Sequence, residues 1–365
     1  MMGTANVARD TRPHRILFLD HAPIIGGGQL SLAEHVRLLD RTRFQPLVAC
    51  TAAAPALLAL YRDAGAEVHV IPLPRLRRVH PLVLPQLVRS VRALRRLVRE
   101  LDVDIVVAST SRAAYIATLG LTRANVPIVW WVRDFLYNRL VFRLLSPRAT
   151  RIICVSEAVR AFYRGENDPR FAVIVVGSTL YRALAGLDDR DVQAERTRWG
   201  FSRDDVVVGF MGRLVEEKGP EDVIAAVADL HQRDPRVKVL IVGSGTGQLN
   251  SVEERARELV ARRGWSFVTF AGFQSDEALY YRLFDVVVLA SREHEGYGMS
   301  AVQAMMARTP VVPPPSAALP NWCGIGKLGC SSRRRRPRGS PRPSPSYAMT
   351  APCASVWWRP PSPRS

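Results

Sequence analysis

Apolar runs alternate with segments of helical periodicity over most of this chain. The first set of runs is predicted to form buried strands of one sheet, at residues 15–20, 103–108, 126–132 and 151–156. Strands that are apolar at successive positions and separated by helices are typical of parallel sheets covered on both faces. The first part of the chain is therefore predicted to be a doubly wound α/β domain.

A second set of strands follows a polar connector at residues 183–203. These strands are predicted at residues 205–211, 237–242, 265–270 and 285–290. The pattern predicts two Rossmann-like domains facing a cleft, an N-terminal domain over residues 15–182 and a second domain over residues 204–315. Residues 1–14 are expected to form a flexible N-terminus. Ligands of such sheets bind beyond the carboxyl ends of the strands, so the loops there are where chemistry is expected.

Composition is that of an ordinary globular protein. The 365 residues are 47% hydrophobic and 23% charged, which is enough for two domains with separate cores. No apolar run approaches the roughly 18 to 20 residues of a transmembrane helix, and residues 1–13 lack the apolar stretch of a secretory signal. We therefore expect a cytoplasmic protein. The five cysteines are odd in number and lack zinc-ligand spacing, so free thiols are expected.

Residues 316–365 differ from the rest of the chain. They hold eight Arg, one Lys and no acidic residue, which is half of the formal net charge of +18, among many Pro and Ser. They lack helical and strand periodicity, so an incomplete second domain and a disordered basic tail are expected. Such a tail can bind nucleic acid or acidic lipid by counterion release. The abrupt change also fits translation of a GC-rich gene in a shifted frame, which we favour, and a nucleic-acid partner is not expected.

A glycine-rich loop follows the first predicted strand. Gly26, Gly27 and Gly28 allow backbone amides to approach a ligand, and the following helix favours an anion at its N-terminus. The spacing is not that of the dinucleotide fingerprint. The loop is a candidate phosphate site, with a plain strand-to-helix turn as the alternative.

Two cations follow the first strand of the second domain. Arg213 and Lys218 stand on a short loop at the carboxyl edge of the predicted sheet, and Pro220 marks where the next helix begins. A guanidinium offers a fixed fork of donors, and an ammonium a mobile point charge. Together they suit a diphosphate whose negative charge grows as a bond to it breaks. Solvated surface cations are the alternative for either residue alone.

The last motif is the loop Glu295-Gly296-Tyr297-Gly298, which leads into a helix that carries Gln303. Apolar residues recur at helical spacing through this helix. With the glycine and two-cation loops, the stretch resembles the donor site of family 4 glycosyltransferases. Their signature is a glutamate, seven residues and a second glutamate, and Gln303 takes the second place here.

The resemblance covers residues 15–312 and implies a GT-B fold. It implies a retaining, metal-independent sugar transfer from a nucleotide-diphosphate sugar to an acceptor hydroxyl, with no cofactor beyond this donor. Arg213 and Lys218 would stabilise the departing diphosphate. Glu295 would contact the hydroxyls of the donor sugar, and the position of Gln303 would hold the ribose. An amide accepts through one oxygen only, so Gln303 is expected to bind the ribose more weakly than a carboxylate would.

The other residues that the resemblance assigns to donor binding are glycines and one tyrosine. They are Gly26, Gly27, Gly28, Gly212, Gly243, Gly272, Gly296, Tyr297 and Gly298. On the acceptor side, family members commonly place a His before an Asp at the end of the strand at residues 126–132. Here the neighbourhood holds Trp131, Arg133 and Asp134, and His21 is a candidate partial substitute.

The segment from residue 75 to residue 100 is unusually basic, with its apolar residues on one helical stripe. A basic amphipathic helix can lie on an anionic membrane, which would suit a lipid-linked acceptor and place the protein at the inner face of the membrane. A core-packed helix with a solvated basic face is the alternative we favour. The acceptor is thus expected to be a glycan, a lipid-linked molecule or a small molecule.

A different class of function stays open at this point. An inactive remnant or a binding protein also fits three features of the sequence. These are Gln303 in place of a carboxylate, the absence of the acceptor-side His and the basic sequence after residue 315. An incomplete second domain would expose apolar surface and favour instability.

Overall fold

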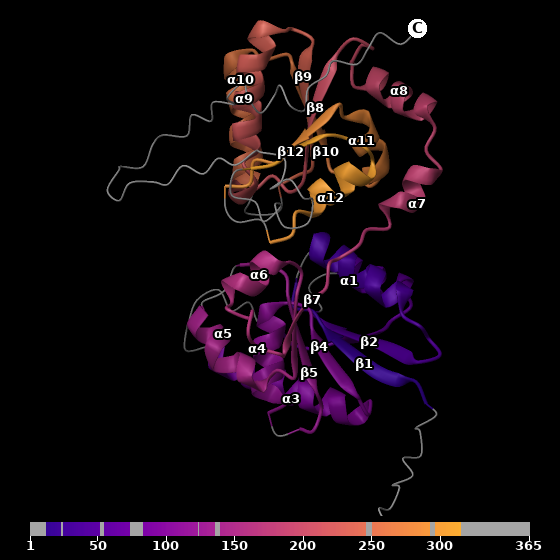
Figure 1. The fold of residues 1–365 in the computed structure, drawn as a ribbon, viewed down its shortest axis with the longest axis vertical. Coiled ribbons are helices and arrows are strands. Elements are labelled where there is room, and N and C mark those ends of the chain that lie inside the picture. Colours follow the sequence, from indigo (N-terminus) through magenta and orange to yellow (C-terminus); the bar gives the residue numbers. More distant parts are fainter. Residues whose placement is uncertain are drawn as a thin grey trace, which may run out of the picture. The chain divides into compact units, whose positions relative to one another are not determined.

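The computed structural model describes residues 12–22, 25–51, 55–73, 83–122, 124–135, 139–245, 250–292 and 296–314. The chain divides into two compact units, with the boundary between Gly177 and Ser178 (Figure 1). Each unit is built on its own parallel sheet. The prediction of two doubly wound α/β domains is confirmed.

The sheet of the first unit has seven parallel strands among the described residues, in the order β3-β2-β1-β4-β5-β6-β7. The strands are β1 (His14–Leu19), β2 (Phe44–Cys50), β3 (Glu67–Val70), β4 (Ile105–Ala108), β5 (Ile128–Val132), β6 (Arg151–Cys154) and β7 (Phe171–Val173). The chain runs outward from β1 to β3 and then returns to the other side of β1. The carboxyl ends of β1 and β4 therefore flank the topological switch point, where such sheets bind ligands.

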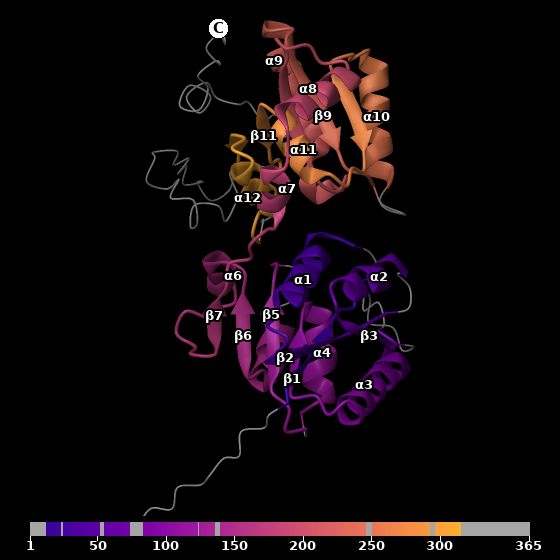
Figure 2. The same ribbon diagram turned by 90° about the vertical axis from the view of Figure 1, so that its right-hand side faces the viewer.

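Helices lie on both faces of this sheet (Figures 1 and 2). They are α1 (Gly27–Leu38), α2 (Pro55–Asp63), α3 (Val83–Glu100), α4 (Ser111–Gly120), α5 (Arg139–Leu145), the short 3-10 helix η1 (Ser146–Arg148) and α6 (Glu157–Phe162). The central strands are buried, as their continuous apolar sequences require, and Leu17, Val48 and Val106 are inaccessible to solvent.

In the described part of the second unit, the parallel sheet has five strands in the order β10-β9-β8-β11-β12. Its strands are β8 (Val206–Met211), β9 (Val237–Val242), β10 (Val268–Gly272), β11 (Val286–Val288) and β12 (Val311–Val312). Its helices are α7 (Leu180–Ala185), α8 (Asp189–Arg198), the 3-10 helix η2 (Glu216–Lys218), α9 (Pro220–Arg233), α10 (Asn250–Arg263), α11 (Glu277–Leu283) and α12 (Met299–Met306). The switch point lies between β8 and β11.

Successive side chains of β8 lie on opposite faces of the sheet, as the two-residue period of a strand requires, and pack in different hydrophobic clusters. Val207 packs in a cluster with residues of α7, α8, α11 and α12. Val208 packs in a second cluster with residues of α9 and α10. The sheet thus has an apolar layer on each face, and its carboxyl edge is left for the loops.

The predicted connector at residues 183–203 contains the second half of α7 and all of α8. Both helices contact α11, and α7 also contacts α12. Arg196 of α8 is buried, and its Nη1 donates to the carbonyl of Leu283 at 2.8 Å and to Asp285 Oδ2 at 3.2 Å. Its Nη2 donates to the carbonyl of Asp205 at 2.7 Å. These bonds fix the connecting segment to the second unit.

Helix α3 carries the basic segment that was considered for membrane binding. Leu94 is fully buried, and Arg95 Nε donates to the carbonyl of Gly120 in α4. By contrast, Leu84 and Val88 near its start are 66% and 37% exposed. The helix is therefore core-packed in its second half and presents apolar side chains to solvent in its first half. Residues 75–82 of this segment lie outside the described residues.

Within the described residues, no helix is both long enough and apolar enough to cross a membrane. Cys50 and Cys154 are buried free thiols, and burial raises the pKa of each to about 12. They therefore stay protonated and pack as small apolar side chains. The other three cysteines lie outside the described residues, as does the segment from residue 315 to residue 365.

Candidate functional site

Three glycines predicted at the donor site lie together at the carboxyl edge of the second sheet. They follow or end β8, β9 and β10, which are neighbours in the sheet. The amide of Gly212 donates to the carbonyl of Val242 at 3.0 Å, and the amide of Gly243 donates to the carbonyl of Gly272 at 2.8 Å. A Cβ on Gly243 would lie 1.9 Å from the carbonyl oxygen of Gly212. No side chain fits there, so the backbone itself forms this part of the edge.

The two predicted cations stand on the loop that leaves β8 at the switch point. Arg213 is exposed, and Lys218 is partly buried at the end of η2. Gly219 has a left-handed conformation with φ of 59°, and Pro220 begins α9. This turn ends η2 and directs the chain into α9, and the first-turn residues Glu221 and Asp222 complement the helix dipole.

The loop after β11 touches this two-cation loop directly. A Cβ on Gly219 would lie 2.5 Å from the carbonyl oxygen of Ala290. Arg292 donates two hydrogen bonds to Asp222, from Nε at 2.7 Å and from Nη2 at 2.9 Å. Its Nη1 also pairs with Glu216, and its amide donates to the carbonyl of Glu217 at 2.9 Å. Arg292 therefore holds the two loops of the switch point together.

Arg292 was not singled out from the sequence. The bonds with Asp222 and the charges of Asp222 and Glu216 raise its pKa, so it is charged at any physiological pH. The signal that could have found it is its place one residue after Ser291, at the end of a predicted strand. Its two hydrogen bonds to Asp222 tie the loop after β11 to the first turn of α9.

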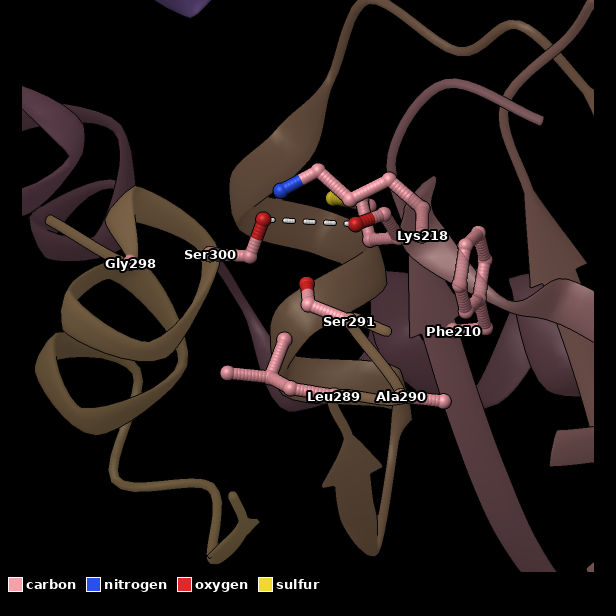
Figure 3. Close-up of a pocket in the computed structure, with 8 residues that line it drawn as sticks. Phe210, Lys218, Leu289, Ala290, Ser291, Gly298 and Ser300 are labelled. Atoms are coloured by element: carbon pink, nitrogen blue, oxygen red, sulfur yellow. Dashed lines mark hydrogen bonds between the residues drawn. The ribbon is translucent and has the colours of Figure 1, made fainter. Parts of the chain in front are cut away.

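A small cavity of about 20 Å³ lies between these loops and the start of α12. Its lining includes Met211, Lys218, Ser291, Gly298 and Ser300. Figure 3 shows the ammonium of Lys218 and the hydroxyls of Ser291 and Ser300 turned toward the same space. The Ser300 hydroxyl donates to the carbonyl of Met211 at 3.3 Å, which ties α12 to the end of β8. This corner therefore combines a cation with hydroxyl groups, a set that suits an anionic oxygen-rich ligand.

The signature loop is described from Gly296 onward, and Glu295 lies outside the described residues. Tyr297 is buried, which raises the pKa of its phenol. Gly298 has a left-handed conformation with φ of 81° and caps α12, so the loop enters the helix through a turn that favours glycine. The structure thus places Gly298 beside the two-cation loop, because it lines the same cavity as Lys218.

Gln303 lies further along α12, inside a hydrogen-bonded chain. Tyr281 Oη donates to Gln303 Oε1 at 3.1 Å, and Gln303 Nε2 donates to Glu277 Oε2 at 2.5 Å. Burial raises the pKa of Glu277, and it also raises the pKa of Tyr281. Both partners belong to α11, so the amide of Gln303 bridges two helices. Sequence reasoning missed Glu277 because nothing in its local pattern marks it.

In the first unit, Arg133 follows β5 and contacts the glycine-rich loop. Its Nη1 donates to the carbonyl of Gly28, and its guanidinium stacks over Trp131 at 3.9 Å. Its Nε and Nη2 are buried and have no hydrogen-bond partner among the described residues. Burial lowers its pKa to about 10, so it remains charged at neutral pH. Gly26 and Gly27 precede this contact at the start of α1.

His21 lies at the switch point of the first sheet, directly after β1. Its Nδ1 is 2.6 Å from Thr110 Oγ1, and Arg112 Nη1 is 3.3 Å from its Nε2. An arginine only donates, so Nε2 is the acceptor and Nδ1 carries the proton. Burial and the charge of Arg112 lower the pKa of His21 to about 4. The imidazole is therefore neutral at physiological pH.

Asp20 connects the His21 and Arg133 sites of the first unit. It is fully buried and accepts a 2.5 Å hydrogen bond from Tyr61 Oη. Burial lowers the pKa of both His21 and Arg133, and the negative charge of Asp20 partly offsets this by raising both values. Asp134, the remaining acceptor-side candidate, follows Arg133, and its backbone carbonyl accepts a 3.4 Å hydrogen bond from Tyr163 Oη. Among the described residues, no group of three or more His, Cys, Asp or Glu side chains could hold a metal ion.

Two family models match the chain. The one described as Glycosyltransferase Family 4 matches residues 25–177, and the one described as Glycosyl transferases group 1 matches residues 191–314. The first match ends where the first structural unit ends, and the second lies within the other unit. The chain belongs to the family 4 glycosyltransferases.

Among curated proteins, the chain is similar to the D-inositol 3-phosphate glycosyltransferase of Corynebacterium jeikeium. The two are 31% identical over 188 residues, which is 49% of the chain and 44% of that relative. The protein of the same name from Corynebacterium aurimucosum is 35% identical over 146 residues, which is 39% of the chain and 34% of the relative. The chain thus spans less than half the length of these relatives.

Among solved structures, the chain is similar to HepE of Anabaena in complex with UDP-glucose. The TM-score is 0.69 and the identity 25%, over 82% of the chain and 80% of HepE. The lipopolysaccharide glycosyltransferase WaaG matches at a TM-score of 0.60 and 16% identity, over 86% of the chain and 84% of that protein, which shows the fold alone. Both comparisons agree with the two-unit GT-B architecture.

Proposed function

We propose that the chain transfers a sugar from a nucleoside diphosphate sugar to an acceptor hydroxyl with retention of configuration. The observation that carries this proposal is the loop with Arg213 and Lys218 at the switch point of the second sheet, which Arg292 ties to the loop after β11. A cation pair fixed at that edge is suited to a diphosphate leaving group. The likeness to HepE, which was solved with UDP-glucose, supports a nucleotide-sugar donor.

In the proposed reaction, the bond between C1 of the sugar and the diphosphate oxygen breaks, and the acceptor oxygen bonds to C1 from the same face. The proton of the acceptor hydroxyl passes to the departing diphosphate. Arg213 and Lys218 neutralise the charge that develops on this group. Glu295 would hold the donor sugar, and Gly212, Gly243, Gly272, Gly296, Tyr297 and Gly298 would form the backbone and aromatic walls of its site. No metal or further cofactor enters this scheme.

The first unit would supply the acceptor side. Two guanidinium nitrogens of Arg133 have no hydrogen-bond partner within the described part of the chain, and Arg133 contacts Gly28. His21 is a neutral base at the same edge of the sheet. A glycan, a lipid-linked molecule or a small polyol would each present a hydroxyl there. The relatives named D-inositol 3-phosphate glycosyltransferases support a small phosphorylated polyol as the first acceptor to test.

The test is a donor panel of UDP-glucose, UDP-N-acetylglucosamine and GDP-mannose, with release of the nucleoside diphosphate as the readout. We expect turnover with one donor, and a loss of roughly 100-fold or more in kcat/KM for Arg213→Ala because the leaving-group charge is no longer neutralised. The exposed Arg203 on the same unit provides the control variant Arg203→Ala. Nucleotide binding with no turnover of any donor would favour a binding protein instead. No binding of any nucleotide would refute the proposal.

Peripheral association with an anionic membrane is proposed from α3. Exposed Leu84 and Val88 stand on the same helix as the exposed Arg89, Arg92 and Arg96. This combination suits an interfacial helix that inserts apolar side chains and pairs with lipid phosphates. Co-sedimentation with phosphatidylglycerol vesicles should fall for Leu84→Glu and persist for Leu119→Glu, an exposed leucine on α4. Equal sedimentation of both variants would contradict it.

A further inference from the structure

The side-chain amide of Gln303 hydrogen-bonds residues of α11 through both its oxygen and its nitrogen. Its oxygen accepts from Tyr281 at 3.1 Å, and its nitrogen donates to Glu277 at 2.5 Å. An ionised carboxylate only accepts, so the nitrogen must be the end that faces Glu277. Tyr281 is 1% exposed, which holds the other end in place. The orientation of this side chain is therefore set by its neighbours.

The two hydroxyls of a ribose need acceptors, and Gln303 has little acceptor capacity left. Its one oxygen already accepts from Tyr281, which leaves a single lone pair for a ligand. Glu277 accepts through Oε2, and within the part of the chain that the structure describes its Oε1 has no hydrogen-bond partner. Glu277 is only partly buried and begins α11, so it is reachable from solvent. Most of the acceptor capacity at this place therefore belongs to Glu277.

The position along α12 fits a ribose next to a diphosphate. Gln303 stands one helical turn after Ser300, which lines the cavity beside Lys218. In a nucleoside diphosphate the ribose is directly bonded to the phosphate chain. A donor with its diphosphate at Arg213 and Lys218 can therefore bring its ribose to the Gln303 and Glu277 pair.

The identities of residues 277 and 303 also depend on each other. Two carboxylates with oxygens 2.5 Å apart could not both ionise, and one would hold a proton at neutral pH. An amide at position 303 instead donates to Glu277 and favours its charged form. Gln303 thus permits an ionised carboxylate on α11 where a second one on α12 would repel it.

We propose that Glu277 is the residue that binds the ribose hydroxyls of the nucleotide, with Gln303 as the positioning residue that orients it. The family signature has the carboxylate of this subsite on α12, whereas in this chain it lies on α11. Gln303 fits this arrangement because its amide donates to Glu277. This inference rests on the proposed function, because it requires a nucleoside diphosphate at the two-cation loop.

Calorimetric titration of the full chain with UDP, GDP and ADP selects the tightest nucleotide, which is then compared with its 2′,3′-dideoxy analogue. We expect Glu277→Gln to weaken binding of the ribonucleotide by roughly 10- to 100-fold, the effect of losing a charged hydrogen-bond acceptor. The affinity for the dideoxy analogue should not change. The swapped variant Glu277→Gln with Gln303→Glu should regain most of the ribonucleotide affinity, because it restores one carboxylate beside one amide.

Glu254→Gln is the matched control, since Glu254 is an exposed carboxylate on α10 of the same unit. Unchanged ribonucleotide affinity in Glu277→Gln would overturn the inference. Equal losses for both ligands would also overturn it, because they would show a structural role only. If the wild-type chain bound none of the three nucleotides, the proposed function itself would fail, and this outcome is distinct from the other two.

Discussion

The backbone of Gly243 passes so close to Gly212 that a Cβ on Gly243 would lie 1.9 Å from the Gly212 carbonyl oxygen. Gly243 has a φ of 133°, a conformation that L side chains rarely adopt. Its amide also donates to Gly272. The close approach and the backbone conformation both require glycine directly after β9.

Gly243→Ala is therefore expected to lower the free energy of unfolding of the second unit by about 2 to 4 kcal/mol. The added methyl group must displace the carbonyl of Gly212 or break the hydrogen bond to Gly272. Urea denaturation followed by circular dichroism measures the change. Gly264→Ala is the matched control, since Gly264 is also left-handed with φ of 64° but has open space around its Cβ position. It should cost only about 1 kcal/mol, and equal costs would contradict this account.

The strands beside the candidate sites could be predicted from the sequence because they are apolar at successive positions. β1, β4, β8 and β11 are all of this kind, and each lies within or close to its predicted range. The strands that the pattern missed are at or near sheet edges. β3 and β7 have four and three residues, β12 has two, and β2 contains Pro46, which hides the strand pattern.

The glycine and cation positions of the site were predictable because strand-to-loop transitions mark the carboxyl edge of a sheet. The contacts that hold these loops together were not. Arg292 pairs with Asp222 across 70 positions in sequence, and Gln303 meets Glu277 across 26. Such pairs depend on strand order, and the placement of β11 beside β8 is decided by tertiary packing. The functional roles of these residues remain predictions.

Arg292→Lys should reduce kcat/KM of the proposed transfer about tenfold while leaving the fold intact. An ammonium cannot make the two hydrogen bonds to Asp222 and also reach Glu216, so the two-cation loop loses its fixed position. Steady-state kinetics and thermal unfolding measure the two effects. Arg262→Lys, an exposed arginine of α10, is the control and should match the wild type. Wild-type kinetics in Arg292→Lys would show that this anchoring is not needed.

Arg196→Ala should destabilise the second unit by about 2 to 4 kcal/mol, because it leaves the carbonyls of Leu283 and Asp205 without their charged donor. The side chain of Arg196 is only 8% exposed, so water cannot replace the lost donors. Chemical denaturation gives the free energy. Arg198→Ala on the same helix removes a guanidinium that is 68% exposed and should change stability by less than about 1 kcal/mol. A similar loss in both variants would argue against the buried anchor.

The protonation of His21 gives a prediction with a defined sign. Its pKa in the folded state, about 4, lies below the usual histidine pKa of about 6.5, so between these values the unfolded chain binds a proton that the folded chain does not. Its contribution to stability is complete above about pH 6.5 and is lost as the pH falls toward 4, by up to about 3 kcal/mol. Stability measured against pH should therefore fall less steeply for His21→Asn than for the wild type over this window.

Arg112→Met tests the cause of the low pKa. Removing this cation deletes both a repulsive charge and the donor to Nε2, so the pKa of His21 should rise from about 4 toward its usual value. The Cε1 proton of His21, assigned in NMR spectra by its absence in His21→Asn, reports the titration directly. Burial is the larger cause, so the pKa should remain below 6.5 in the variant. A titration identical to that of the wild type would show that Arg112 has no part in keeping this imidazole neutral.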